Sequence, residues 1–194
     1  MNQARKQQNK KAPLGSIRII AGKYRGRKLP VLMAEGLRPT TDRVKETLFN
    51  WLMPYIQDAN CLDCFAGAGS LGFEALSRGA KKVSLIELNK AAAKQLLANK
   101  QLLKSDNVVI CNANVLDFLR TPALNKFDLV FVDPPFRQNL ISQTCALLED
   151  AWLTEQALIY VEMEAEGNQE LPNNWLLLKE KIAGQVAYRL YQRT

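Results

Sequence analysis

From residue 60 onwards, short apolar segments alternate with longer segments of helical periodicity, and this alternation most constrains the fold. The short segments are continuously apolar, which is typical of parallel strands covered by helices on both faces. We therefore expect an α/β sheet built from repeated strand–helix units. The pattern predicts strands at 61–66, 82–86, 107–112, 127–132 and 157–162, and helices that end at residue 77 or span 89–103, 115–119 and 139–148.

The end of the chain departs from this alternation. Residues 175–179 and 186–191 are β-prone and are separated by a short loop containing Gly184, with no helix between them. This spacing predicts an antiparallel hairpin that closes the sheet. Together with the five preceding strands, the hairpin gives a mostly parallel sheet of seven strands.

The start of the chain is strongly basic. The first 30 residues contain nine lysines or arginines and no acid, so the other 164 residues carry 17 bases against 19 acids. The net charge of +7 therefore belongs to this segment, which indicates a polyanionic partner. A solvated basic tail without a partner is the alternative.

Within this basic segment, two β-prone runs at 16–32 flank Gly22 and Gly26 and predict a hairpin. A helix is expected from Asp42 to about Met53, with Val44, Leu48, Trp51 and Leu52 on one face. We divide the chain into a disordered basic tail at 1–15, a basic β-hairpin extension at 16–36 and a catalytic domain at 37–194.

Several classes of chemistry are disfavoured by composition. The chain has no histidine, which removes mechanisms based on a histidine base or ligand. Cys61 and Cys64 form a single C-x-x-C inside an apolar strand, so we interpret them as core residues and expect no metal. The polar N-terminus is no signal peptide and no segment is long enough to span a bilayer, so we expect a cytoplasmic protein.

A glycine-rich turn follows the first strand of the repeat. Gly67, Gly69 and Gly72 form G-x-G-x-x-G before a helix, and Glu87 ends the next strand. Such a turn brings backbone N–H groups close to a ligand, and the carboxylate can accept both ribose hydroxyls. The pattern alone fits NAD, FAD or S-adenosylmethionine (SAM). Asp63 favours SAM, because a carboxylate just before the glycines can reach the cationic amino-acid end of that cofactor.

A second motif, Asp133-Pro134-Pro135-Phe136, follows the fourth strand of the repeat. Ligands of open α/β sheets bind beyond the carboxyl ends of the strands, so we expect this loop beside the glycine turn. The exocyclic amine of a base is a poor nucleophile, because its lone pair is delocalised into the ring. The Asp133 carboxylate and the Pro134 carbonyl can hold its two N–H groups while Phe136 stacks on the base. A rigid turn without function is the alternative.

Asn114, after the third strand of the repeat, carries a weaker signal. Its side chain can hydrogen-bond the adenine of a cofactor, with Val115 packing near the ring, or it can cap a helix.

Three segments together resemble the RsmD family, bacterial 16S ribosomal RNA guanine-N2 methyltransferases. They are 38–52, 62–75 and 131–136, and the resemblance continues from about Ser16 to the end of the chain. The resemblance implies a SAM-dependent methyltransferase fold, methylation of one guanine in the 16S RNA of the small ribosomal subunit, and SAM as cofactor. It implies a catalytic loop of Asp133, Pro134, Pro135 and Phe136, and cofactor contacts from Asp63, Phe65, Ala66, Gly67, Gly69, Glu87, Asn114 and Val115.

A ribosome is a dense polyanion, which gives the basic segment a role. Phosphate contacts position such an enzyme, and the target base must be unstacked to enter the pocket. We expect a monomer whose RNA contacts include Arg18, Lys23, Arg25, Arg27, Lys28, Arg38 and Arg43.

Other functions remain open at this point. N6-adenine methylation of RNA or DNA uses the same chemistry of an exocyclic amine. An NAD-dependent oxidoreductase explains the glycine turn and Glu87 but leaves the Asp133 loop without a role. A non-catalytic RNA-binding assembly factor explains only the basic segment.

Overall fold

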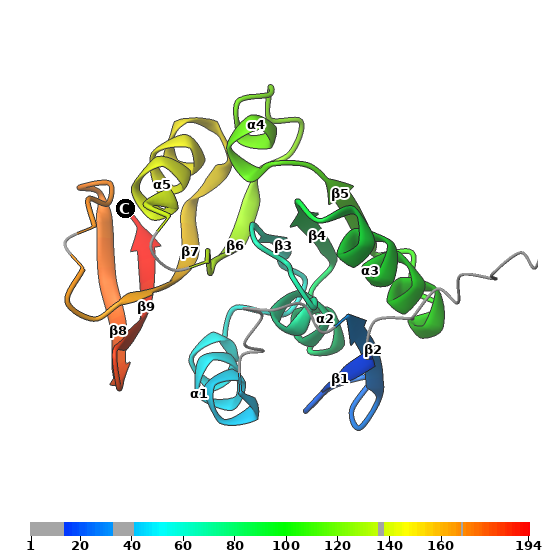
Figure 1. The fold of residues 1–194 in the computed structure, drawn as a ribbon. Helices are drawn as coiled ribbons and strands as arrows, with labels where there is room; N and C mark the ends of the chain where they lie inside the picture. Colours follow the sequence, from blue (N-terminus) through cyan, green and yellow to red (C-terminus); the bar gives the residue numbers. More distant parts are fainter. Residues whose placement is uncertain (1–13, 33–40, 136–137, 168) are drawn as a thin grey trace, which may run out of the picture.

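A computed structural model describes residues 14–32, 41–135, 138–167 and 169–194. Its main feature is one seven-stranded sheet with the order β5-β4-β3-β6-β7-β9-β8 (Figure 1). The first five of these strands in space run parallel, and β9 pairs antiparallel with both β7 and β8. The strands are β3 (Asn60–Asp63), β4 (Lys82–Glu87), β5 (Val108–Asn112), β6 (Phe127–Val132), β7 (Leu153–Glu164), β8 (Trp175–Ala183) and β9 (Val186–Arg193).

Helices cover both faces of this sheet (Figure 1). Alternate residues of β6 enter two different core clusters, Leu129 and Phe131 on one face and Val130 and Val132 on the other. A continuously apolar strand is therefore buried on both sides, as predicted for an α/β sheet. The strand order and the antiparallel pairing of β8 with β9 confirm the predicted fold with its closing hairpin. The helices are α1 (Asp42–Leu52), α2 (Ser70–Ser77) and α3 (Lys90–Leu103) on the first face, and α4 (Val115–Leu119) and α5 (Leu140–Ala151) on the second.

The predicted N-terminal hairpin is present as a separate two-stranded sheet. β1 (Leu14–Arg18) pairs antiparallel with β2 (Lys28–Leu32). The hairpin is not independent of the main fold, since its buried side chains join the core cluster under α1, α2 and α3. The predicted disordered tail, residues 1–15, lies almost entirely outside the described residues.

The segment between β1 and β2 is anchored to the second half of α2. The buried Glu74 carboxylate accepts the backbone N–H groups of Ile20 and Ala21, at 2.8 and 3.1 Å. The Ser77 hydroxyl accepts the N–H of Tyr24, and the Ser77 carbonyl accepts the N–H of Lys23 at 2.7 Å. The basic hairpin is therefore held in a defined orientation.

Helix α1 begins at the predicted turn, where the Thr41 hydroxyl accepts the N–H of Val44. Its buried face differs from the prediction, because Lys45 and Phe49 are buried beside Leu48 and Leu52. The Lys45 side chain is only 2% exposed, and its Nζ donates to the Arg18 carbonyl at 2.7 Å. This hydrogen bond to a backbone carbonyl of β1 explains how a charged side chain can be buried on the inner face of α1. Periodicity alone predicted only apolar residues on that face.

No helix among the described residues has both the length and the apolar character needed to cross a membrane.

Candidate active site

The glycine turn after β3 is closed against the end of β4. The N–H of Gly67 donates to Glu87 Oε2 at 2.8 Å, and the N–H of Asn89 donates to Glu87 Oε1 at 2.6 Å. Glu87 therefore shapes the turn with both oxygens, a role that its spacing from the glycines did not reveal. Lone pairs remain on both oxygens for a ligand's hydroxyl groups.

Close packing explains why the turn needs glycine at position 69. Gly69 has φ +77°, and a Cβ there would meet the Phe73 ring at 2.6 Å and the Leu96 side chain at 2.7 Å. The next residue, Ser70, begins α2 with a buried hydroxyl that has no hydrogen-bond partner among the described residues. An unpartnered hydroxyl at the N-terminus of a helix, directly after a glycine turn, is suited to a polar ligand.

Asp63, the last residue of β3, lies under this turn and is 3% exposed. Its Oδ2 accepts the N–H of Gly72 at 3.2 Å. Burial raises the pKa of Asp63 to about 7; the N–H groups of Gly72 and Phe65 oppose the rise, and the nearby Glu87 carboxylate adds to it. An acid in this setting is stabilised in its charged form by a cation, so Asp63 is suited to a cationic ligand.

Asp133 and Pro134 lie directly after β6, next to β3 in the sheet. Asp133 is half-buried, Pro134 is buried and Pro135 is exposed. Burial raises the pKa of Asp133 well above its ordinary value, and the carboxylates of Glu162 and Asp63 raise it further. Phe136, predicted to stack on the base, lies outside the described residues.

Four carboxyl groups thus stand at the carboxyl ends of four neighbouring strands. In the order of the sheet they are Glu87 on β4, Asp63 on β3, Asp133 after β6 and Glu162 on β7. The Glu87 carboxylate raises the pKa of Asp63, and the carboxylates of Asp63 and Glu162 raise the pKa of Asp133. Within the described residues, no group of three or more acids or cysteines is placed to hold a metal ion. We call these four residues the acidic row.

Glu162 and its neighbour Tyr160 did not stand out in the sequence. The Tyr160 hydroxyl donates to Glu162 Oε2 at 3.2 Å. Burial raises the pKa of Glu162 to about 7, against the opposing hydrogen bond from Tyr160. In the sequence, Glu162 is visible only as an acid that follows the apolar run 157–161. Its place beside Asp133 depends on β7 lying next to β6, which the sequence does not reveal.

The third-strand region supports one of the two expected roles. The Asn114 side chain accepts the N–H groups of Leu116 and Asp117, at 2.9 and 3.3 Å, and so caps α4. Val115 is buried at the start of that helix. The neighbouring Asn112 donates to the carbonyls of Glu87 and Leu88, at 2.8 and 2.9 Å. These bonds hold the ends of β4 and β5 together and were not expected from the sequence.

Phe65 is partly buried, and Ala66 is buried with its N–H donating to the Ile86 carbonyl at 2.9 Å. This bond joins the loop that follows β3 to the end of β4, where the predicted cofactor contacts lie.

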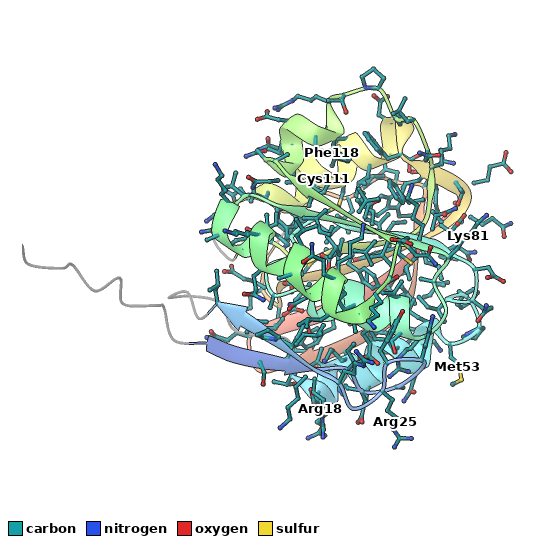
Figure 2. All side chains as sticks on the ribbon, turned by 90° about the vertical axis from the view of Figure 1, so that its right-hand side faces the viewer. Arg18, Arg25, Met53, Lys81, Cys111 and Phe118 are labelled. Atoms are coloured by element: carbon teal, nitrogen blue, oxygen red, sulfur yellow. The ribbon has the colours of Figure 1, made fainter. Side chains whose placement is uncertain are left out.

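The predicted RNA-binding residues are spread over the hairpin and α1, and the described ones are exposed. Arg18 donates to Asp42 at 2.9 Å, and Arg27 donates to the Leu102 carbonyl at 3.1 Å, so these two also hold the hairpin to its neighbours. Figure 2 shows Arg18 and Arg25 at the outer edge of the molecule. Arg38 lies outside the described residues, and the remaining exposed members are Lys23, Lys28 and Arg43.

The end of β2 reaches the glycine turn. Val31 and Leu32 line a small hollow together with Gly67, Ala68 and residues 92, 95 and 96 of α3. The basic extension therefore contacts both the far end of α2 and the loop that begins it.

Residues 17–192 match the protein family described as conserved hypothetical protein 95, known as the RsmD family. The chain belongs to the RsmD family. Its curated relatives include the ribosomal RNA small subunit methyltransferase D of Haemophilus influenzae, 60% identical over 92% of this chain and 94% of the relative. The protein of the same name from Escherichia coli K12 is 58% identical over 92% of this chain and 91% of the relative.

Solved structures agree with this membership of the RsmD family. A putative methyltransferase from Escherichia coli superposes with a TM-score of 0.86 at 58% identity, covering 92% of this chain and 98% of that one. A putative methylase from Haemophilus influenzae gives a TM-score of 0.82 at 56% identity, covering 92% and 99%. A putative SAM-dependent methyltransferase from Streptococcus mutans shares the fold at 17% identity, with a TM-score of 0.66 over 96% of this chain and 57% of that one. The fold is therefore that of SAM-dependent methyltransferases.

Proposed function

We propose that this chain transfers a methyl group from SAM to the N2 amine of one guanine in 16S ribosomal RNA, within the small ribosomal subunit. The observation that carries the proposal is the position of Asp133 and Pro134, at the carboxyl end of β6 and beside the glycine turn of β3. The names of the two relatives, small subunit methyltransferase D, support the RNA substrate.

The residues around the glycine turn fit SAM. The cofactor supplies an electrophilic methyl group on a cationic sulfonium. In this proposal, the Asp63 carboxylate binds its cationic amino-acid end and the Glu87 carboxylate accepts its ribose hydroxyls. Ser70 offers a buried hydroxyl without a partner among the described residues. The other proposed contacts are Phe65, Ala66, Gly67, Gly69, Asn114 and Val115.

The acidic row favours SAM over a nicotinamide dinucleotide. A dinucleotide brings a doubly charged pyrophosphate to the glycine turn, whereas SAM brings two positive charges and one carboxylate. Carboxyl groups at neighbouring strand ends attract cations and, when ionised, repel phosphates, and a bound cation favours their ionised form. The same row therefore argues against the oxidoreductase alternative.

In the reaction, Asp133 and Pro134 act on the amine of the target base. The Asp133 carboxylate and the Pro134 carbonyl accept its two N–H groups, which draws the nitrogen out of conjugation and directs its lone pair at the methyl group. After transfer the nitrogen carries an extra proton and is strongly acidic, so the proton leaves to Asp133 or to water. Catalysis then rests mainly on alignment.

The basic hairpin and α1 supply the contacts to the ribosome. Because the hairpin is anchored to α2, phosphates bound along it fix the position of the RNA relative to the glycine turn and to Asp133. We propose Arg18, Lys23, Arg25, Arg27, Lys28, Arg38 and Arg43 for these contacts, and a cytoplasmic monomer as the active species.

The test is methylation of small subunits taken from cells that lack this enzyme, with labelled SAM and nucleoside analysis of the product. Label in N2-methylguanosine is expected. Label in N6-methyladenosine would be consistent with the proposed alignment of an exocyclic amine, but it would reject guanine as the target base. Bound SAM without transfer to subunits, assembly intermediates or free RNA would reject the proposed reaction.

A further inference from the structure

A second carboxyl group lies beside Asp133 on the same face of the sheet. Val132 of β6 pairs with Val161 of β7, so Asp133 and Glu162 are the next residues along two adjacent strands. Phe131 and Tyr160, two residues before Asp133 and Glu162 respectively, pair directly in the sheet. Their rings meet edge-on, with centroids 6.4 Å apart. Because strand side chains alternate, Asp133 and Glu162 point to the same face as these two rings.

Glu162 forms no ion pair within the part of the chain that the structure describes. The Tyr160 hydroxyl donates to its Oε2 at 3.2 Å. This bond occupies Oε2 and fixes the direction of the carboxyl group, while Oε1 keeps its accepting capacity for another donor. Placing a partly buried acid against a second acid costs stability, and such arrangements are concentrated at functional sites.

The target amine and its neighbouring ring atom present two different donors. On guanine, the N2 amine stands next to N1, which carries a hydrogen. On adenine, the N6 amine stands next to an N1 that has no hydrogen and only accepts. A carboxyl oxygen beside the group that holds the amine therefore accepts from guanine and repels adenine, since flipped bases are read on this edge.

We propose that Glu162, oriented by the Tyr160 hydroxyl, accepts the N1–H of the target guanine while Asp133 and Pro134 hold its N2 amine. Glu162 is then a specificity-determining residue of the base pocket, and Tyr160 is its positioning residue. This inference rests on the proposed guanine-N2 activity.

The test compares two substrates that differ at N1. Small subunits are reconstituted with 16S RNA carrying either guanine or 2,6-diaminopurine at the methylated position, which is mapped on fragments of the labelled RNA. Diaminopurine keeps the N2 amine but its N1 carries no hydrogen. Wild-type protein is expected to prefer guanine in kcat/KM by about 10- to 100-fold, the usual size of discrimination by a well-placed hydrogen-bonding pair.

The variant Glu162→Gln keeps the shape of the side chain and adds an amide donor that can bind the bare N1. It is expected to lose activity on guanine and to gain on diaminopurine, so that the preference falls by about tenfold or more. Tyr160→Phe is expected to reduce the preference less. The matched control is Glu164→Gln, an exposed acid two residues further along β7, which should keep the wild-type preference.

SAM affinity and the unfolding midpoint are measured for each variant, so that a folding defect is recognised. Equal wild-type rates on the two substrates would reject this role of Glu162 and leave guanine methylation intact. An equal loss on both substrates in Glu162→Gln would reject it too, since that result describes a residue that supports the pocket without reading N1. If wild-type protein binds SAM but labels no guanine, the proposed function fails, and this inference fails with it.

Discussion

The N–H of Tyr24 donates to the hydroxyl of Ser77 at 2.9 Å, a bond between residues 53 positions apart in the sequence. It joins the connection between β1 and β2 to the last residue of α2, the helix that begins at the glycine turn. The basic hairpin and the proposed cofactor site are therefore two ends of one packed unit.

Two glycines in this connection provide a matched test of the anchoring. Gly22 and Gly26 both have φ +81°, but a Cβ on Gly22 would meet the Ser77 carbonyl oxygen at 1.8 Å, whereas nothing lies within 4 Å of one on Gly26. Gly26→Ala should lower the free energy of unfolding by about 1–2 kcal/mol through backbone strain alone. Gly22→Ala should cost clearly more and weaken RNA binding. Urea unfolding and subunit binding measure both, and equal costs would contradict the anchoring.

Replacing Asp133 should separate catalysis from cofactor binding. Asp133→Ala removes an acceptor of the target amine, and we expect transfer to fall by about 100-fold or more, as when a preorganised electrostatic partner of the reacting group is removed. SAM binding, measured by calorimetry, should persist. The unfolding midpoint should not fall, because a partly buried acid beside other acids opposes folding. Loss of SAM binding would make Asp133 a cofactor residue instead.

The pH dependence follows from the same group of acids. Asp133 must be ionised to accept the amine strongly, and its pKa is raised by burial, by Glu162 and by Asp63. We therefore expect kcat/KM for RNA, at saturating SAM, to rise with pH well above the range in which an ordinary aspartate titrates, and then to level off.

Glu162→Gln should move this rise to lower pH. The substitution removes the neighbouring negative charge, which lowers the pKa of Asp133, while Asp63, Tyr160 and Tyr188 remain nearby. Glu164→Gln serves as the control and should leave the profile in place. A profile unchanged in Glu162→Gln would show that Asp133 does not govern the rate in this range.

The basic hairpin should determine the salt dependence of RNA binding. Arg25→Gln combined with Lys28→Gln removes two exposed charges and leaves Arg27, which holds the Leu102 carbonyl. Affinity for small subunits should fall, and the slope of log K against log salt should flatten by about 0.7–0.9 for each phosphate that the variant no longer neutralises. Arg120→Gln with Lys126→Gln, at two exposed residues that follow α4, should leave the slope unchanged.

The sheet and its helices were predictable because the strands between residues 61 and 162 are largely apolar runs, and the first four are followed by a glycine, asparagine or proline signal. The positions of Asp63, Gly67 and Asp133 were predictable for a related reason, since parallel strands bring their carboxyl ends to one edge. These inferences use only local periodicity and a general rule of topology.

Lys45, Glu74 and Glu162 were not predictable in this way. Lys45 is buried because a carbonyl of β1 meets it, and Glu74 because two N–H groups of the same extension do. Glu162 matters because β7 lies beside β6 in the sheet. All three depend on segments distant in the sequence, and periodicity carries no information about such contacts.

The acidic row has a consequence for how a nucleotide can approach. The protein as a whole attracts RNA with a net charge of +7, yet Glu87, Asp63, Asp133 and Glu162 make the floor of the proposed pocket repel phosphate. In the proposed reaction, the uncharged base of the target nucleotide enters the pocket, while its phosphates stay outside and contact the arginines and lysines of the basic hairpin. Under the proposed function, we expect this charge distribution to favour an extruded base of a long polyanion over a free mononucleotide.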